Sequence, residues 1–553
     1  MKKTIPIGVS TYHKMRKEDY YFVDKSDMIR EFLERKNEVT LITRPRRFGK
    51  TINMSMLAEF FDITKDSKAL FEDTIIAKSE YAKEMNQYPM IFLSFANCKG
   101  DAHSLKMNVF DLLQIEMGKY YPLIKQLPKE DNLMLRYERL YHSIMNSEDF
   151  TQVQLCIKIM CELLYKTYDK AVMLFIDEYD TPFIEAHVNG CYEELHSSMA
   201  GMLSTALKNN PYLKYAMLTG IQRIAKENIF SGLNNLKVYT VKDKEYAKYF
   251  GFTKEETKEL LEYFDMEYGE DVKGMYDGYR IGDADIYNPW SIVNYASDKI
   301  LCPYWVNTSA NTMIKQAMEK SDHTFHQEYE TLIQAGSVDV NCNLETSFYE
   351  EAESATLWGL FLNAGYLTVE KVLDAFEGKY RLRIPNREVA REFRSLTMDY
   401  LHQKPDIFNK MMEGLCKADP DRFIENYRHF LMSAVSYHDL MNENSCHSLL
   451  LGMCAYLSHD YTITSNREAG KGRYDILLQA KRERYPSYVI ELKYVKQEEY
   501  EKHPSLLEEQ CELALKQIKD SRYDYDLKGD IIHIALAHCK KDVEMKWIKK
   551  VVA

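Results

Sequence analysis

The chain has 553 residues, of which 45% are apolar and 28% charged, a balance typical of soluble globular material in several domains and not of disorder. No apolar run approaches the roughly eighteen residues that a membrane helix needs, and the stretch after Met1 is too short for a signal peptide, so we expect a cytoplasmic protein. The net charge of −12 counts against indiscriminate coating of DNA, because such binding neutralises phosphates with lysine and arginine.

The first predicted chemical centre is a strand, a loop and a helix near the N-terminus. The strand at residues 39–43 runs into the loop, and a helical pattern follows. Exposed backbone N–H groups and the positive end of a helix dipole favour phosphate at such a turn. Arg44 stands where the usual pattern has glycine, so the loop could be less tightly wound, or arginines could surround the phosphates. The alternative is a basic loop that merely precedes a helix. We therefore expect this loop to bind a nucleotide through Arg44, Arg46, Arg47, Phe48, Gly49, Lys50 and Thr51.

A buried parallel strand is predicted at residues 171–176, and it ends in Asp177 and Glu178. Sites in open α/β sheets form at the carboxyl ends of strands. We therefore expect Thr51 and Asp177 to hold Mg²⁺ and Glu178 to polarise the attacking water. The alternative is a strand that simply ends in a polar turn.

A third strand is predicted at residues 215–219, ending at Gly220-Ile221-Gln222-Arg223. Thr219 could contact the γ-phosphate of a nucleotide. Arg223 could stabilise transition-state charge, either within the chain or in a neighbouring copy. The reading of both as ordinary turn residues stays open.

The second predicted centre lies near the C-terminus, on a hairpin. Asp475 precedes Glu491 by sixteen residues, which leaves room for one strand, a polar turn and the strand back. Side chains alternate along a strand, so Glu491 and Lys493 share one face while Ile490 and Leu492 pack behind them. Two carboxylates with a lysine form a hard oxygen site for Mg²⁺ that can act on a phosphodiester. A solvated sheet face is the alternative.

Helices on both sides of this hairpin add candidates. Glu443 opens an apolar helical run and is a plausible third carboxylate. The amphipathic pattern at residues 506–518 carries Gln510 and Gln517 on one face. A buried strand is expected at residues 531–537. The cysteines include no Cys-x-x-Cys pair and the histidines no His-x-x-x-His pair with a carboxylate, so neither zinc nor disulfides are expected.

The order helix, strand, strand, helix, strand, with these acids, lysine and glutamine, resembles the PD-(D/E)XK nuclease superfamily, with Tyr474 in place of the usual proline. Nearly the whole chain resembles a bacterial family that fuses an AAA-like ATPase domain to a C-terminal PD-(D/E)XK nuclease-like domain. The resemblance rests on residues 44–51, 175–180, 219–220, 223–226, 472–475 and 491–493. It implies ATP binding and a nuclease fold, and it implies that arginine is the usual residue of this family at position 44.

We therefore predict an α/β protein of three parts. Residues 1–288 form an AAA-ATPase-like P-loop domain with a parallel sheet, and residues 289–440 form a lid or winged-helix-like and helical connecting region. Residues 441–553 form a PD-(D/E)XK nuclease-like α/β domain. The expected cofactors are ATP and Mg²⁺.

The leading hypothesis is an ATPase whose nucleotide state controls a metal-dependent nuclease. DNA is favoured over RNA as the partner, and no binding to a membrane is expected. Nucleotide-dependent assembly of identical copies is left open. Defence against mobile DNA, or its maintenance, is an analogy for such a fusion. The alternative is a nucleotide-controlled switch whose nuclease-like domain binds nucleic acid or a partner without cleaving. A translocating motor is a third reading, which no helicase motif supports.

Overall fold

A computed structural model describes residues 2–147, 149–224, 234–305, 314, 317–318, 321, 323–346, 353–400, 405–434, 443–454, 457, 460–465, 468–469, 472–525 and 527–550. The chain divides into two compact units. The first contains Met1–Lys320 and Val340–Val389, and the second contains Ser321–Asp339 and Ala390–Ala553. Residues of the region expected at 289–440 are thus shared between the two units.

The first unit is built on a five-stranded sheet. Its strands are β1 (Val39–Thr43), β2 (Met90–Ser94), β3 (Val172–Asp177), β4 (Leu213–Gly220) and β6 (Leu236–Tyr239). They lie in the order β2-β3-β4-β1-β6, and every neighbouring pair is parallel. β3 is buried along its whole length, which explains its continuous apolar run. The predicted parallel α/β sheet is confirmed.

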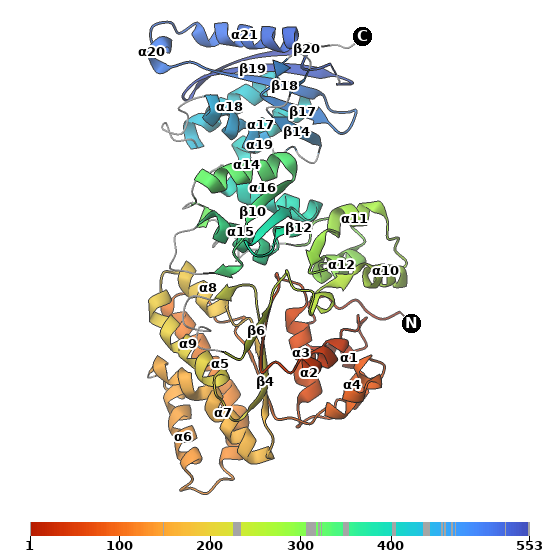
Figure 1. The fold of residues 1–553 in the computed structure, drawn as a ribbon, viewed down its shortest axis with the longest axis vertical. Coiled ribbons are helices and arrows are strands. Elements are labelled where there is room, and N and C mark those ends of the chain that lie inside the picture. The colour runs from red at the N-terminus through yellow and green to blue at the C-terminus, as the bar shows by residue number, and fades with distance from the viewer. Residues whose placement is uncertain are drawn as a thin grey trace. The chain divides into compact units, whose positions relative to one another are not determined.

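Helices cover both faces of this sheet (Figure 1). One face, with Ile42 and Phe175, packs against α1 (Tyr12–Lys17), α2 (Asp27–Arg35) and α3 (Lys50–Phe61). The other face, with Leu41 and Ile176, packs against α5 (Ala102–Ile124), α7 (Val153–Tyr168) and α9 (Tyr192–Leu207). The remaining elements around this sheet are α4 (Lys68–Phe71), η1 (Ile76–Lys78), η2 (Glu80–Glu84), α6 (Asn132–Met145), η3 (Phe150–Gln152) and α8 (Thr181–Val188).

A small α/β lobe follows the sheet within the same unit. Its antiparallel strands, in the order β7-β9-β8, share a core with α10, α11 and α12. Thr253 and Glu256 form a capping box that starts α10. The elements are η4 (Ala247–Tyr249), β7 (Phe252–Thr253), α10 (Lys254–Tyr263), α11 (Glu270–Tyr276), β8 (Tyr279–Ile281), β9 (Ala284–Tyr287) and α12 (Pro289–Asp298).

The rest of the first unit contains the antiparallel hairpin of β12 (Thr368–Asp374) and β13 (Lys379–Arg383), preceded by α15 (Ser354–Ala364). A short parallel pair joins β5 (Arg223–Ile224) to β11 (Glu345–Thr346). Two elements contain a point of division between the units, namely β10 (Ser337–Asn341) and α16 (Arg387–Tyr400).

The second unit is built on a mixed sheet in the order β14-β17-β18-β19-β20. Only β18 and β19 are parallel among the described neighbours. The strands are β14 (Tyr461–Ser465), β17 (Ile476–Ala480), β18 (Ser487–Tyr494), β19 (Ile531–Cys539) and β20 (Asp542–Lys550), with a separate pair of β15 (Glu468–Ala469) and β16 (Gly472–Arg473). The predicted nuclease-like α/β fold is confirmed, and β14 and β20 extend it.

Both faces of the second sheet are covered by helices (Figure 1). One face, with Ile490 and Leu492, packs against α17 (Pro405–Lys417), α18 (Pro420–Ala434) and α19 (Glu443–Cys454). The other face, with Val489, packs against α21 (Leu506–Ser521). The remaining helices are α14 (His323–Ala335) and α20 (Gln497–Tyr500). Among the helices that the structure describes, none is long and apolar enough to cross a membrane.

Candidate functional site

Lys50 is the first residue of α3, after the loop that follows β1, and its side chain is buried. Its Nζ donates to the carbonyl oxygens of Arg44 at 2.9 Å and Pro45 at 2.8 Å. Burial lowers the pKa of Lys50, and the nearby acids Glu178 and Asp177 act in the opposite direction. Gly49 precedes the helix with a φ of +81°, a left-handed conformation that glycine adopts without strain. The loop therefore wraps the ammonium group with its own carbonyls.

Asp177, the last residue of β3, links the end of β4 to the first turn of α3. Its Oδ2 accepts from the Thr51 hydroxyl at 2.7 Å, and its Oδ1 accepts from the Thr219 hydroxyl at 2.5 Å. These groups meet because β4 lies between β1 and β3, and all three strands end at the same edge. Burial raises the pKa of Asp177, and the two hydroxyl bonds offset part of that shift. The structure thus brings together residues that lie far apart in the sequence.

Glu178 follows Asp177 with a φ of +51° and accepts from the Thr181 hydroxyl at 3.1 Å. It lines a cavity of about 600 Å³, which is within the size range of small-molecule sites. The loop after β1 and the start of α3 contribute to its lining Arg46, Arg47, Phe48, Gly49, Lys50 and Thr51. Its apolar walls come from the N-terminal segment and the small lobe, and include Ile5, Val9, Phe22, Phe252, Leu260 and Phe264.

Arg44 and Arg223 are placed away from this cavity. The guanidinium of Arg44 is fully buried and donates to the carbonyls of Thr43 at 2.9 Å and, more weakly, of Tyr239 and Glu245. Arg223 lies in β5, where its backbone is in register with that of Glu345 in the neighbouring strand β11. In this structure the Arg44 guanidinium ties loop backbones together, and none of the described residues that it bonds lines the cavity. The adjoining motif positions 225 and 226 lie outside the described residues.

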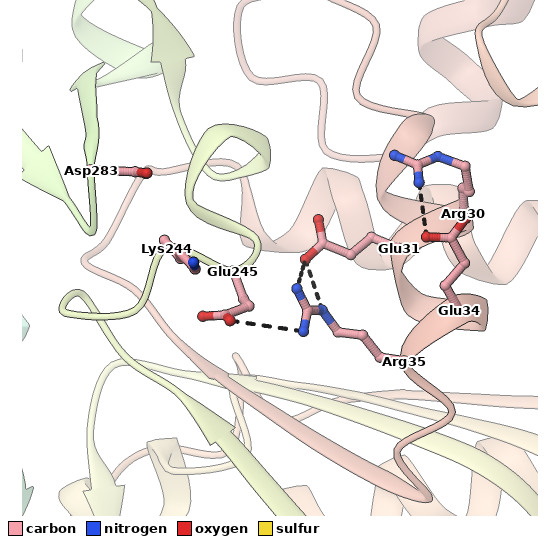
Figure 2. A pocket seen from close by; sticks show the side chains of 7 residues that line it. All are labelled: Arg30, Glu31, Glu34, Arg35, Lys244, Glu245 and Asp283. Atoms are coloured by element: carbon pink, nitrogen blue, oxygen red, sulfur yellow. Dashed lines mark hydrogen bonds and ion pairs between the residues drawn. The ribbon is translucent and has the colours of Figure 1, made fainter.

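A smaller charged cavity of about 350 Å³ has Glu245 in its lining (Figure 2). The backbone carbonyl of Glu245 also accepts from Arg44. The charges of this cavity are largely paired with one another. Arg35 bonds Glu31 at 2.7 Å and lies 3.9 Å from Glu245, and Arg30 bonds Glu34 at 2.8 Å. The lining is Arg30, Glu31, Glu34, Arg35, Lys244, Glu245 and Asp283. We interpret it as a surface ion-pair network that supports the nearby backbone.

Sequence reasoning missed Asp180. Its fully buried carboxylate accepts from the backbone N–H groups of Ile221 at 2.8 Å and Gln222 at 2.7 Å. Burial raises the pKa of Asp180 to about 6, against the pull of those two donors. Gly220 permits this contact, because an added Cβ would lie 2.7 Å from the Asp180 carboxylate. The signal available in the sequence was Asp180 itself, which is the third acidic residue in the run from Asp177 to Asp180.

The nuclease-like centre forms where β17 and β18 begin to pair. The register sets Ile476 opposite Ile490, so Asp475 lies opposite Glu491. Asp475 accepts from the backbone N–H of Leu492 at 2.7 Å. Lys493 donates to Glu491 Oε1 at 3.1 Å, and Gln517 of α21 donates to the same oxygen. The structure therefore gathers four of the predicted residues.

Glu491 is the most perturbed acid of this centre. Its side chain is only 2% exposed, and burial, with a contribution from Asp475, raises its pKa to about 7 although Lys493 acts against the shift. Glu491 Oε2 is buried with no hydrogen-bond partner among the described residues. A hard divalent cation would satisfy this oxygen, so the residues fit a metal held by Asp475 and Glu491. Within the described residues, no group of three or more His, Cys, Asp or Glu side chains is arranged to hold a metal.

We expect the substitution Glu491→Gln to stabilise the metal-free protein more at high pH than at low pH. The folded pKa of about 7 lies above the ordinary value of 4.5, so the folded chain keeps a proton that the unfolded chain releases between these values. Stability from this group is present at low pH and is lost as the pH rises through 7, by at most about 3 kcal/mol. Thermal unfolding in chelator at pH 5 and pH 8 tests this. An equal effect of the substitution at both pH values would contradict it.

Three further residues near the nuclease-like centre are Glu443, Gln510 and His447, and each lies at a different place. Glu443 is exposed at the start of α19. Burial lowers the pKa of Lys493, but the charges of Glu491, Asp475 and, last, Glu443 raise it, and the net shift is upward. Gln510 lies two turns, about 10 Å, before Gln517 along α21. His447, which sequence reasoning missed, bonds the backbone carbonyl of Asp475 at 3.1 Å and the hydroxyl of Ser465 at 2.9 Å. Its spacing of four residues from Glu443 was the available signal.

Lysines near the C-terminus, Lys549 and Lys550, are paired with acids. Lys549 bonds Asp530 at 2.7 Å, and Lys550 bonds Asp524 at 2.7 Å. Lys541 makes a long contact of 3.4 Å to the carbonyl of Met432. These pairs reduce the charge that β20 offers to a phosphate backbone.

Comparison with known proteins gives two matches along the chain. Residues 6–230 match the family described as Predicted AAA-ATPase, and residues 441–548 match the PD-(D/E)XK nuclease superfamily. A protein of Azotobacter chroococcum mcd 1, named "Uncharacterized protein in vnfD 5'region", is 24% identical over 417 residues, covering 74% of this chain and 73% of its own. No solved structure matches the chain.

Proposed function

Because this chain joins an AAA-ATPase-like domain to a PD-(D/E)XK nuclease superfamily domain, we propose that it binds and hydrolyses ATP and thereby controls a metal-dependent nuclease. DNA is the favoured substrate. The nuclease half of the proposal is carried by the surroundings of Glu491, which lies opposite Asp475. One carboxylate oxygen of Glu491 accepts hydrogen bonds from Lys493 and Gln517, and the other has no partner among the described residues.

The ATPase half of the proposal assigns each polar group one task. Lys50 would leave the carbonyls of Arg44 and Pro45 for the phosphates, which are stronger partners for an ammonium group. Thr51 and Asp177 would hold Mg²⁺, which supplies charge neutralisation on the phosphates. Glu178 would take the proton of the attacking water. The apolar walls of the 600 Å³ cavity suit the base of the nucleotide.

In the nuclease half, Asp475 and Glu491 would hold a divalent ion. When bound, the ion neutralises phosphate charge and lowers the pKa of water. Lys493 would hold the scissile phosphate or orient that water, and its ammonium, 3.1 Å from Glu491, supports this role. Gln517 fixes the Glu491 carboxylate from α21. The raised pKa of Glu491 supports this assignment, because perturbed carboxylates cluster at functional sites.

We also propose a cytoplasmic location, a role in defence against or maintenance of mobile DNA, and assembly of identical copies that depends on nucleotide. A translocating motor would need such assembly, and native mass with and without ATP measures it.

The test is a cleavage assay on the purified full-length chain. Plasmid, linear duplex, single-stranded DNA and RNA are incubated with Mg²⁺ or Mn²⁺, with and without ATP. We expect cleavage of DNA that requires the metal and changes rate with ATP. Absence of cleavage of every substrate by a chain that binds ATP would overturn the nuclease and favour a nucleotide-controlled switch.

A further inference from the structure

Arg47 of the phosphate loop is held by contacts that do not involve the loop itself. Its guanidinium lies 4.5 Å from the centre of the Trp290 ring and donates to the Tyr304 carbonyl at 3.0 Å. The indole Nε1 of Trp290 donates to that same carbonyl at 3.1 Å. Arg47 also has a φ of +66°, a left-handed conformation that costs energy for any residue with a side chain. The surrounding contacts therefore maintain this conformation.

The carbonyl that binds Arg47 belongs to a segment clamped by a buried acid. The backbone N–H groups of Tyr304 and Trp305 donate to Glu388 Oε1 at 2.7 and 2.8 Å, and the Ser291 hydroxyl donates to Oε2 at 2.8 Å. Glu388 is 1% exposed. Burial raises the pKa of Glu388, its three donors offset part of that shift, and the charge of Arg47 adds to the offset.

Glu388 is the second residue of α16, and this helix belongs to both units. The division of the chain falls between Val389 and Ala390, so the first turn of α16 lies in the first unit and the rest in the second. A change at Glu388 therefore acts on a helix that continues by covalent connection into the unit that carries Glu491.

A nucleotide in the cavity would compete for Arg47. Both Arg47 and Trp290 line the cavity together with Lys50 and Thr51. Phosphate binds a guanidinium through charge-assisted, often bidentate hydrogen bonds, which are stronger than bonds to a neutral carbonyl or an indole face. Withdrawal of Arg47 would leave Glu388 with less compensation for its burial, and uncompensated buried charges destabilise their surroundings.

We propose that Arg47 exchanges Trp290 and Tyr304 for a nucleotide phosphate, and that this exchange loosens the Glu388 clamp at the start of α16. The inference rests on the proposed ATP binding and names the route by which it reaches the nuclease unit. The coupling is reciprocal, so anything that weakens the Trp290 contact raises the affinity for nucleotide.

The experiment is amide hydrogen exchange at residues 387–393 of the full-length chain, with and without a non-hydrolysable ATP analogue and Mg²⁺, alongside calorimetric measurement of nucleotide affinity. In the wild type, we expect nucleotide to accelerate exchange there by about threefold or more. In Trp290→Leu, exchange is already fast without nucleotide, and nucleotide binds about fivefold more tightly. Glu388→Gln, which keeps the acceptor oxygen but removes the charge, shifts both quantities in the same directions and replaces Trp290→Leu if that variant fails to fold.

The matched control is Tyr485→Leu, which removes another arginine-aromatic contact, with Arg484 at 4.7 Å, from the second unit. It leaves exchange at 387–393 and nucleotide affinity at wild-type values. Nucleotide binding without any change at α16, or weaker binding by Trp290→Leu, would overturn the relay while leaving the ATPase proposal standing. A wild-type chain that binds no nucleotide would overturn both.

Discussion

Replacing Glu491 by glutamine is expected to reduce nucleic-acid cleavage by about a thousandfold or more, equivalent to roughly 4 kcal/mol in the barrier. Glutamine keeps the shape and accepts the same bonds from Lys493 and Gln517, but it removes the charge that would bind the metal. The measurement is the rate of DNA cleavage under saturating Mg²⁺ or Mn²⁺. ATP hydrolysis by the same variant stays near the wild-type rate.

The two glutamines of α21 provide a matched control for this result. Gln517 contacts Glu491 and Gln510 lies two turns away on the same helix. Gln517→Ala should lower cleavage by about ten- to a hundredfold, as is typical when a residue that orients a metal ligand is lost. Gln510→Ala should stay within about twofold of wild type. Equal losses in both variants, or full activity in Glu491→Gln, would remove these residues from the reaction.

Replacing Glu178 by glutamine is expected to slow ATP hydrolysis by about a hundred- to ten-thousandfold while ATP remains bound. The substitution removes the group assigned to the attacking water, but it leaves Lys50, Thr51 and Asp177 in place to hold the nucleotide. The measurements are phosphate release and nucleotide affinity. The variant should then stay in its ATP-bound form, so its cleavage rate in ATP should match that of wild type with a non-hydrolysable analogue.

Glu193→Gln is the control for the ATPase prediction, because Glu193 is exposed in the first turn of α9 and lies outside the cavity lining. It should hydrolyse ATP at the wild-type rate. Hydrolysis by Glu178→Gln at the wild-type rate would exclude Glu178 as the base. Loss of ATP binding in that variant would instead give Glu178 a role in holding the nucleotide.

Local patterns in the sequence were sufficient where one segment carries the whole signal. The strand, loop and helix around Lys50 and the apolar strand that ends at Asp177 are contiguous runs, so periodicity and turn chemistry identify them without tertiary information. The same holds for β18, whose alternation sets Ile490 and Leu492 into the core and Glu491 on the opposite face. Even the pairing of Asp475 with Glu491 followed from the length of the hairpin.

Only the tertiary structure decided which member of an equivalent set reaches a site. Gln510 and Gln517 share a face of α21, but the docking of that helix on β18 brings only Gln517 to Glu491. Arg44 and Arg47 are both loop arginines, yet Arg44 is enclosed by backbone carbonyls while Arg47 meets Trp290, more than two hundred residues later. His447 and Asp180 were missed for the same reason. Their partners are backbone groups of distant segments, and sequence spacing carries no record of where packing places a backbone carbonyl or N–H.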